Sequence, residues 1–241
     1  MWKCPPSTVL VPVDFGDASG RALAVASALA SRVDARVVVL HVETIDVPPY
    51  FTREQFAMIE RERRTARTKA ELFLRESAKR HGIEACDAVI ANGSPTAAIV
   101  EAARGADLVV MGTHGRRGPS RWWLGSVAER VVHDCGTPVL VVRAALGGVA
   151  PGAIFDRPLV VSPTGAEDIA LRVATGLARA FGGTVGDTIV TCQSDLAQEE
   201  HATLVVVSKT ASLHGVLFGH SAEQWLRSCT LPMLFVPSAT T

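Results

Sequence analysis

Residues 106–142 read ADLVVMGTHGRRGPSRWWLGSVAERVVHDCGTPVLVV, and they contain most of what the chain reveals about its fold. An apolar run at 106–111 leads into a glycine-rich loop, an amphipathic helix follows at 124–134, and a second apolar run occupies 138–142. Both runs are apolar on two faces, as is typical of strands that are buried in a parallel sheet. A strand, a helix and a strand in succession predict a βαβ unit.

The residues before this stretch continue the same alternation. Apolar runs predict three further strands, at 8–13, 35–42 and 86–91. The spacing of apolar residues predicts helices at 22–33, 52–81 and 95–104. Together these elements predict an α/β domain over residues 1–145, with an open, doubly wound parallel sheet flanked by helices. The long helix among them carries charges of both signs, which favours a solvated face over a nucleic-acid-binding arm.

The rest of the chain repeats the first part in a shortened form. The glycine-rich segment AALGGVAPG predicts a linker, which we place at 146–156. After it, residues 159–164 align with 9–14, 202–207 with 106–111 and 232–236 with 138–142. The charged helix and one strand of the first part have no counterpart in this alignment. We therefore predict a truncated second α/β lobe at 157–241, which leans on the first lobe because it buries less surface of its own.

Composition limits the class of protein. The chain has 241 residues, 48% of them hydrophobic, with 24 basic and 24 acidic side chains and a formal net charge of zero. A packed core is therefore expected, whereas a general electrostatic attraction to nucleic acid or to an anionic membrane is not. The sequence has no apolar run of the about 20 residues that span a bilayer, no signal-peptide pattern and no C-x-x-C, so we expect a reduced, cytoplasmic protein.

The loop that follows the strand at 106–111 carries the strongest chemical signal. Its glycines Gly112, Gly115 and Gly125 leave room for backbone N–H groups to approach the oxygens of an anion. Ser126 adds a hydroxyl at the start of a helix, where the helix dipole is positive. Ligands of open α/β sheets bind beyond the carboxyl ends of the strands, so the first strand's Asp14 should face this loop.

Simpler interpretations explain each of these residues singly. Glycines after a strand usually only form the turn. Ser126 and Glu129 have the spacing of a capping box, which accounts for the serine without a ligand. Asp14 stands where a helix cap or an Asx turn is expected. The combination of these residues, between a strand and a helix, favours an anion site.

The spacing of the loop resembles that of the universal stress protein family. Four residues match the pattern G-x2-G-x9-G-[S/T] of its ATP-binding members, namely Gly112, Gly115, Gly125 and Ser126. The resemblance covers residues 8–143 well and 157–237 weakly, so the chain looks like a tandem universal stress protein with a degenerate second copy. It implies two Rossmann-like open sheets of the adenine nucleotide alpha-hydrolase-like type.

The resemblance also implies an adenine nucleotide site, with ATP and Mg2+ as its ligands. The residues that it assigns to the nucleotide are Pro12, Val13, Asp14, Val42, Met111, Gly112, His114, Gly115, Arg116, Gly125, Ser126, Val127 and Ala128. By this resemblance, residues 12–14 line the adenosine and Val42 packs near the base. Residues 111–116 wrap the ribose and phosphates, and residues 125–128 hold the phosphates at the helix start.

The second copy departs from this pattern. Its replacements are Ser208 for Gly112, Ala211 for Gly115, His220 for Ser126 and Thr164 for Asp14. Because side chains in place of glycines crowd a phosphate, we expect this lobe to bind nucleotide poorly or not at all. Family members pair through their last strands, which implies that residues 138–142 and 232–236 pair within this chain as a pseudo-dimer. Homodimer formation stays open.

Three functions are compatible with the sequence. The first is an ATP-binding sensor or signalling protein of the stress response, in which the nucleotide orders the glycine-rich loop and changes a partner surface. The second is a slow ATPase or other nucleotide-dependent enzyme, for which Asp14 and His114 are the available bases or ion ligands. The third is a nucleotide-free protein-interaction module. The sequence contains no P-loop, HExxH or GxSxG motif.

Overall fold

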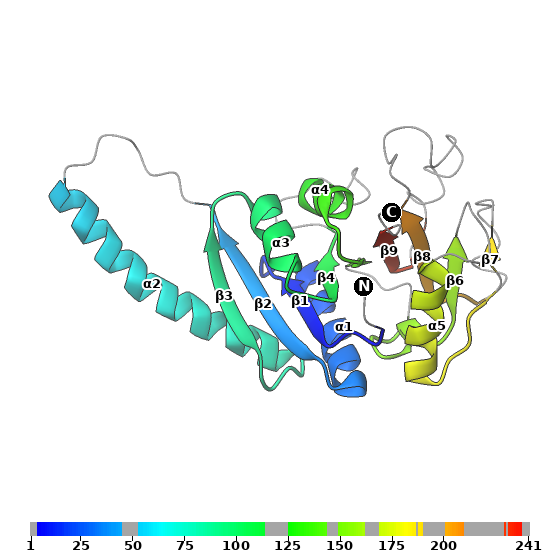
Figure 1. Cartoon of the computed structure of the whole chain (residues 1–241). Coiled ribbons are helices and arrows are strands. Elements are labelled where there is room, and N and C mark those ends of the chain that lie inside the picture. The colour runs from blue at the N-terminus through cyan, green and yellow to red at the C-terminus, as the bar shows by residue number, and fades with distance from the viewer. Residues whose placement is uncertain are drawn as a thin grey trace.

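A computed structural model of the chain describes residues 4–44, 53–113, 125–143, 149–161, 169–186, 188–189, 201–209, 229 and 231–237, of which 53–64 and 188–189 are described by their backbone alone. The elements alternate along the chain (Figure 1). The first half contains β1 (Thr8–Pro12), α1 (Asp17–Val33), β2 (Arg36–Glu43), α2 (Arg53–Arg80), β3 (Asp87–Asn92), α3 (Pro95–Ala103), β4 (Leu108–Gly112), α4 (Ser126–Asp134) and β5 (Val139–Val142). The second half contains the short 3-10 helix η1 (Ala153–Phe155), β6 (Pro158–Val161), α5 (Ile169–Phe181), β7 (Thr188–Ile189), β8 (Leu204–Lys209) and β9 (Met233–Pro237).

These strands form one nine-stranded sheet, in the order β3-β2-β1-β4-β5-β9-β8-β6-β7. Neighbouring strands are parallel except for β5 and β9, which pair antiparallel with Leu140 opposite Leu234. The predicted α/β class is confirmed, and the two halves meet edge to edge through the two strands that were expected to pair. Counted outward from this junction, the first half has the order β5, β4, β1, β2 and the second half the order β9, β8, β6, β7. In each half the last strand lies at the junction and is followed by the strand before it, then by the first and second strands.

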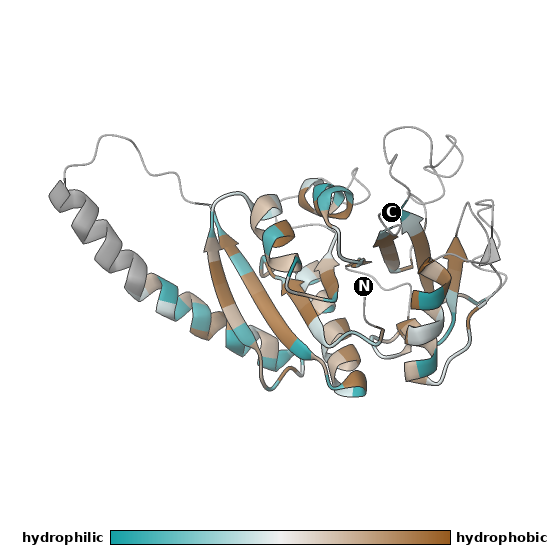
Figure 2. Ribbon diagram, viewed as in Figure 1, coloured by the Kyte–Doolittle hydropathy of each residue, from teal (hydrophilic) through white to brown (hydrophobic). Residues whose placement is uncertain are grey.

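Apolar side chains cover both faces of the sheet. Alternate strand residues such as Val9 and Val110 pack with α1, α2 and α5, while their neighbours Leu10 and Val109 pack with α3 and α4. Figure 2 shows mostly hydrophobic strands, whereas the helices combine hydrophobic and hydrophilic residues. Both hydrophobic layers contain residues of both halves, so the halves share one core. The long helix α2 runs past the edge strand β3 (Figure 1).

The structure moves two of the predicted boundaries. The strand predicted at 106–111 begins at Leu108, and just before it the Asp107 carboxylate accepts hydrogen bonds from the N–H and hydroxyl of Ser7, at 2.8 and 2.6 Å. The segment predicted as a linker at 146–156 contains η1, whose Ile154 and Phe155 are fully buried. The end of that segment is therefore part of the shared core.

Cys4 offers a test of how the N-terminal segment packs on the second half. Its thiol donates a weak hydrogen bond to the Val173 carbonyl of α5, at 3.7 Å. Burial raises the pKa of the Cys4 thiol from 9.0 to about 11. Because the thiolate is the reactive form, we expect Cys4 to be alkylated at pH 8 about 100-fold more slowly in the folded than in the denatured chain, as followed by mass spectrometry. Equal rates in the two states would contradict this packing.

Candidate functional site

The sheet has its switch point between β1 and β4, which are parallel neighbours. From β1 the chain proceeds to β2 and β3 on one side, whereas from β4 it proceeds to β5 on the other. Loops that follow two such strands enclose the crevice in which open α/β sheets bind their ligands. Pro12 and Gly112 end the two strands at this edge. The fold thus brings the predicted site residues after β1 and β4 to the switch point.

Asp14 holds the turn that follows β1. Its Oδ1 accepts a hydrogen bond from the Gly16 N–H at 3.1 Å, which is the Asx turn that the simpler interpretation predicted. The other carboxylate oxygen has no hydrogen-bond partner among the residues that the structure describes, and the side chain is partly exposed. One carboxylate oxygen of Asp14 therefore stabilises the turn, and the other is available to a ligand at the carboxyl ends of the strands.

Gly112 lies where the first turn of α1 passes the end of β4. A Cβ at this position would lie 2.7 Å from the carbonyl carbon of Ala18 and 2.9 Å from the nitrogen of Ser19. Both are backbone atoms, which cannot rotate away as a flexible side chain does. The close packing of α1 therefore explains this glycine without any ligand, and it places the start of α1 against the end of β4.

The start of α4 is a helix N-terminus whose N-cap residue is a glycine. Gly125 is the N-cap, with φ 70°, and its carbonyl accepts the first intrahelical hydrogen bond, from the Glu129 N–H at 3.0 Å. The N-cap is thus a glycine and not Ser126, so the capping-box interpretation of Ser126 and Glu129 is wrong, and no side chain among the described residues caps the helix. Ser126 is the first helical residue, is exposed, and has no hydrogen-bond partner among the described residues. Its hydroxyl and the free N–H groups of the first turn are the donors at this site.

Other residues that the resemblance assigned to a nucleotide lie in the core. The side chains of Val13, Met111 and Ala128 are at most 4% exposed and pack in the two hydrophobic layers. Their side chains therefore hold the sheet and α4 together, and a ligand would meet their backbone. The partly exposed members of the assigned set are Pro12, Asp14, Val42, Gly112, Gly125 and Val127.

An aromatic cluster beside Asp14 was missed by the sequence analysis. Phe15 has a left-handed backbone, with φ 63°, and its ring lies 4.7 Å from that of His41 and 4.9 Å from that of Phe73 on α2. The His41 Nδ1 lies 2.7 Å from the Val13 carbonyl oxygen, so this nitrogen carries the proton and donates it. These contacts tie the turn after β1 to β2 and α2. The sequence gives no signal for them, since a left-handed backbone favours glycine or asparagine.

Part of the predicted site lies outside the described residues. This applies to His114, Gly115 and Arg116, and to Thr164, Ala211 and His220 of the second half. Ser208 is described: it lies opposite Val236, as Gly112 lies opposite Val142, and its side chain is buried. The strand register therefore agrees with the alignment of Ser208 on Gly112.

Neither a metal cluster nor a membrane-spanning helix is found among the described residues. No group of three or more His, Cys, Asp or Glu side chains is placed there to hold a metal ion. Within the same residues, no helix combines the length and the apolar character that crossing a membrane requires.

Comparison with known proteins relates this architecture to a family. A model of the universal stress protein family matches residues 6–143, which is more than half of the chain. The chain belongs to the universal stress protein family. A universal stress protein of Thermus aquaticus is 38% identical over 138 residues, which cover 56% of this chain and 98% of that protein. One from Methanocaldococcus jannaschii is 34% identical over 140 residues, which cover 56% and 81%.

Solved structures extend the likeness to both halves of this universal stress protein. A universal stress protein of Archaeoglobus fulgidus superposes with a TM-score of 0.66 at 19% identity, over 96% of each chain. A functionally unknown protein of Pseudomonas aeruginosa superposes with a TM-score of 0.59 at 15% identity, over 97% of this chain and 93% of that one. At such identities the likeness concerns the fold alone.

Proposed function

We propose that the first half of this universal stress protein binds ATP, or a related adenine nucleotide, and that the protein works in the cytoplasm as a sensor or signalling protein of the stress response. The observation that carries this proposal is the start of α4, where Gly125 and Ser126 present donors that no side chain among the described residues caps. The proposal is supported by the spacing of Gly112, Gly115, Gly125 and Ser126, which resembles that of ATP-binding family members.

The chemistry of this helix start suits phosphate oxygens. The first N–H groups of a helix have no intrahelical acceptor, and the helix dipole places partial positive charge beside them. The exposed Ser126 hydroxyl adds a donor of adjustable direction. In the same proposal the partly exposed Pro12 and Val42, at the ends of β1 and β2, offer apolar contacts to the adenine base.

Mg2+ would accompany the phosphates and offset their negative charge. This ion is usually held by substrate phosphates, water and one or two carboxylates. Asp14 suits that role, because one of its oxygens has no partner among the described residues.

We further propose that the chain is a tandem, with a nucleotide-binding domain at 1–145, a linker at 146–156 whose end packs in the shared core, and a shortened second domain at 157–241 that binds no nucleotide. The buried Ser208 supports this assignment, because it replaces the glycine that lies at the end of β4. The neighbouring Lys209 is engaged with α4 of the first half. The strand end that would receive a second nucleotide thus carries two side chains already packed into the protein.

Replacing Ser126 with alanine tests the proposed site. We expect the Kd for ATP with Mg2+, measured by calorimetric titration, to rise about tenfold, because one hydrogen bond to a charged group is lost. Ser94→Ala is a matched control, since Ser94 is also exposed at the start of a helix on the same face of the sheet, with no side-chain cap. We expect the control to bind as the natural protein does.

The titration also decides between the proposed function and its alternatives. An equal loss in both serine variants, or tight binding by Ser126→Ala, would place the nucleotide elsewhere. Absence of binding by the natural protein, once any nucleotide carried through purification has been removed, would favour the interaction module. Release of inorganic phosphate in step with binding, lost in Asp14→Asn, would favour the slow ATPase.

A further inference from the structure

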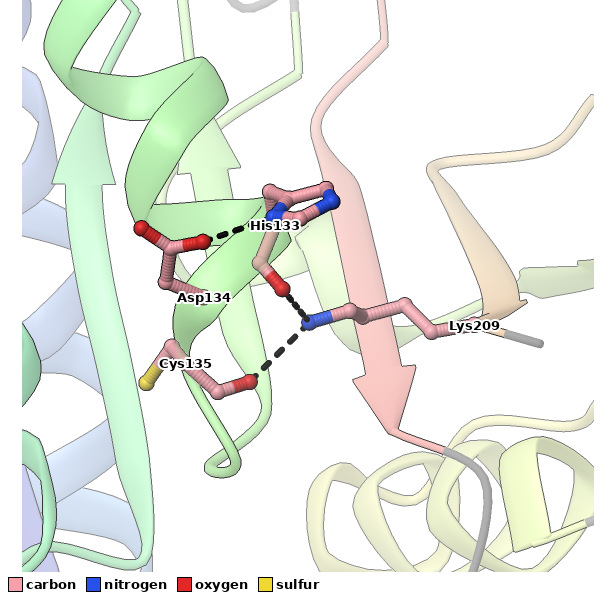
Figure 3. A network of polar contacts seen from close by, with 4 residues as sticks. All are labelled: His133, Asp134, Cys135 and Lys209. Carbon is pink, nitrogen blue, oxygen red and sulfur yellow. Dashed lines mark hydrogen bonds and ion pairs between the residues drawn. The ribbon is translucent and has the colours of Figure 1, made fainter. Parts of the chain in front are cut away.

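Lys209 is a buried cation that joins the two halves of the molecule. It ends β8 in the second half, and its side chain is 8% exposed. Its Nζ donates hydrogen bonds to the carbonyl oxygens of His133, at 3.3 Å, and Cys135, at 2.9 Å. Figure 3 shows the lysine extending from the end of β8 to the last turn of α4, which lies in the first half.

The sheet register explains how a strand of one half reaches a helix of the other. Residues 205, 207 and 209 alternate onto the face that packs with α3 and α4, where Val205 and Val207 are core residues. The next strand, β9, separates β8 from β5. The lysine side chain is long enough to cross β9 on this face, and it arrives at the residues that connect α4 to β5.

The contact is chemically favourable at this end of the helix. The last carbonyl groups of a helix have no intrahelical donor and carry partial negative charge, which an ammonium group satisfies. Burial lowers the pKa of Lys209, and the nearby Asp134 opposes that effect. The His133 side chain is turned away from this contact, with its Nδ1 2.6 Å from an Asp134 carboxylate oxygen. Lys209 thus acts as a C-terminal cap that is supplied by the other half of the chain.

The two ends of α4 then have different partners. The helix has nine residues, so its ends are about 13 Å apart and move together as one rigid element. Its N-terminus presents Gly125 and Ser126 at the proposed phosphate site, and its C-terminus is held by Lys209. The position of the donors therefore depends on a contact made by the half that is proposed to bind no nucleotide.

We infer that Lys209 is a positioning residue for the nucleotide site, and that the second half of the chain serves the first by fixing the C-terminal end of α4. This inference rests on the proposed function, since it concerns how the same site is held. It gives the degenerate half a role in nucleotide affinity without a ligand of its own.

A second contact between the halves supplies a matched control. Arg32, at the end of α1, donates from its Nε to the carbonyl oxygen of Ala180, near the end of α5, at 2.7 Å. It also joins a basic side chain of one half to a helix C-terminus of the other, but it does not involve α4. Arg32→Met therefore loosens the contact between the halves without releasing the site helix.

The test compares Lys209→Met, Lys209→Arg and Arg32→Met with the natural protein. Methionine has nearly the volume of lysine, but it leaves the carbonyl oxygens of His133 and Cys135 without this donor, so the variant is expected to fold with a lower free energy of unfolding. We expect Lys209→Met to raise the Kd for ATP with Mg2+ about fivefold at a temperature where every variant is fully folded. Lys209→Arg, which keeps the donor, is expected to recover most of the affinity, and Arg32→Met to keep all of it.

Three results would overturn the inference. One is natural affinity in Lys209→Met, the second is equal weakening by Lys209→Met and Arg32→Met, and the third is failure of Lys209→Arg to recover any affinity. If the natural protein binds no ATP, the proposed function fails instead, and hydrogen exchange then decides about Lys209. Faster exchange of the amides of residues 126–134 in Lys209→Met than in Arg32→Met supports the inference that Lys209 fixes the C-terminal end of α4, and equal exchange refutes it.

Discussion

Leu234→Ala is expected to lower the free energy of unfolding by about 2–5 kcal/mol, the usual cost of a cavity left by a buried leucine. Leu234 of β9 lies opposite Leu140 of β5, and both side chains are fully buried. The substitution therefore opens a cavity at the junction of the two halves. Because both hydrophobic layers run through both halves, we also expect one cooperative transition in urea, in the variant as in the natural protein.

Leu72→Ala is the control for this prediction. Leu72 lies on α2 and is 59% exposed, so its truncation should change the free energy of unfolding by less than about 0.5 kcal/mol. Equal effects of the two leucine substitutions would show that the strand junction contributes no more than the surface does. Two separate transitions in the natural protein would show that the halves fold independently, contrary to a shared core.

Gly112→Ala is expected to destabilise the protein by about 1–3 kcal/mol and to weaken nucleotide binding as well. Its Cβ would lie 2.7 and 2.8 Å from atoms of Ala18 and 2.9 Å from the Ser19 nitrogen, so the start of α1 has to move. That movement carries the turn at Asp14 with it, because this turn leads directly into α1. Urea unfolding measures the first effect and calorimetric titration with ATP and Mg2+ the second.

Gly136→Ala is the matched glycine control. A Cβ at Gly136 would meet no atom within 4 Å, so we expect a change of less than about 1 kcal/mol in stability and an unaltered Kd. If Gly112→Ala left both stability and binding at their natural values, the close approach of α1 to β4 would be refuted. Weaker nucleotide binding with an unchanged free energy of unfolding would instead show that the glycine is needed for the ligand and not for the packing of α1.

The fold was largely predictable because its signals are local. Apolar strands and periodic helices mark each element of the first half, and the spacing of Gly112, Gly115, Gly125 and Ser126 indicates the family. The pairing of β5 with β9 was expected from the resemblance, and the structure shows that it is antiparallel, with Leu140 opposite Leu234.

What the sequence could not indicate depends on contacts between distant segments. The role of Lys209 depends on which face of the sheet its side chain occupies along β8 and on the position of β9 between β8 and β5. The sequence around residue 209 indicates neither of these. The burial of Phe155 was hidden because it follows a glycine-rich segment that reads as a linker. Ser126 was ambiguous for a different reason, because helix boundaries predicted from sequence are uncertain by a residue or two. With Ser126 as the N-cap, its hydroxyl would serve the helix; with Gly125 as the N-cap, as observed, the hydroxyl is available to a ligand.

Hydrogen exchange of the natural protein with and without ATP and Mg2+ would locate the nucleotide. The amides of residues 125–129, at the start of α4, and 14–19, at the start of α1, are expected to exchange more slowly when nucleotide is bound. Residues 204–209 of β8, which share one core with the first half, are expected to be slowed less than the start of α4. Unchanged exchange at the start of α4 under saturating nucleotide, or protection confined to the second half, would contradict a site in the first half built on Gly125 and Ser126.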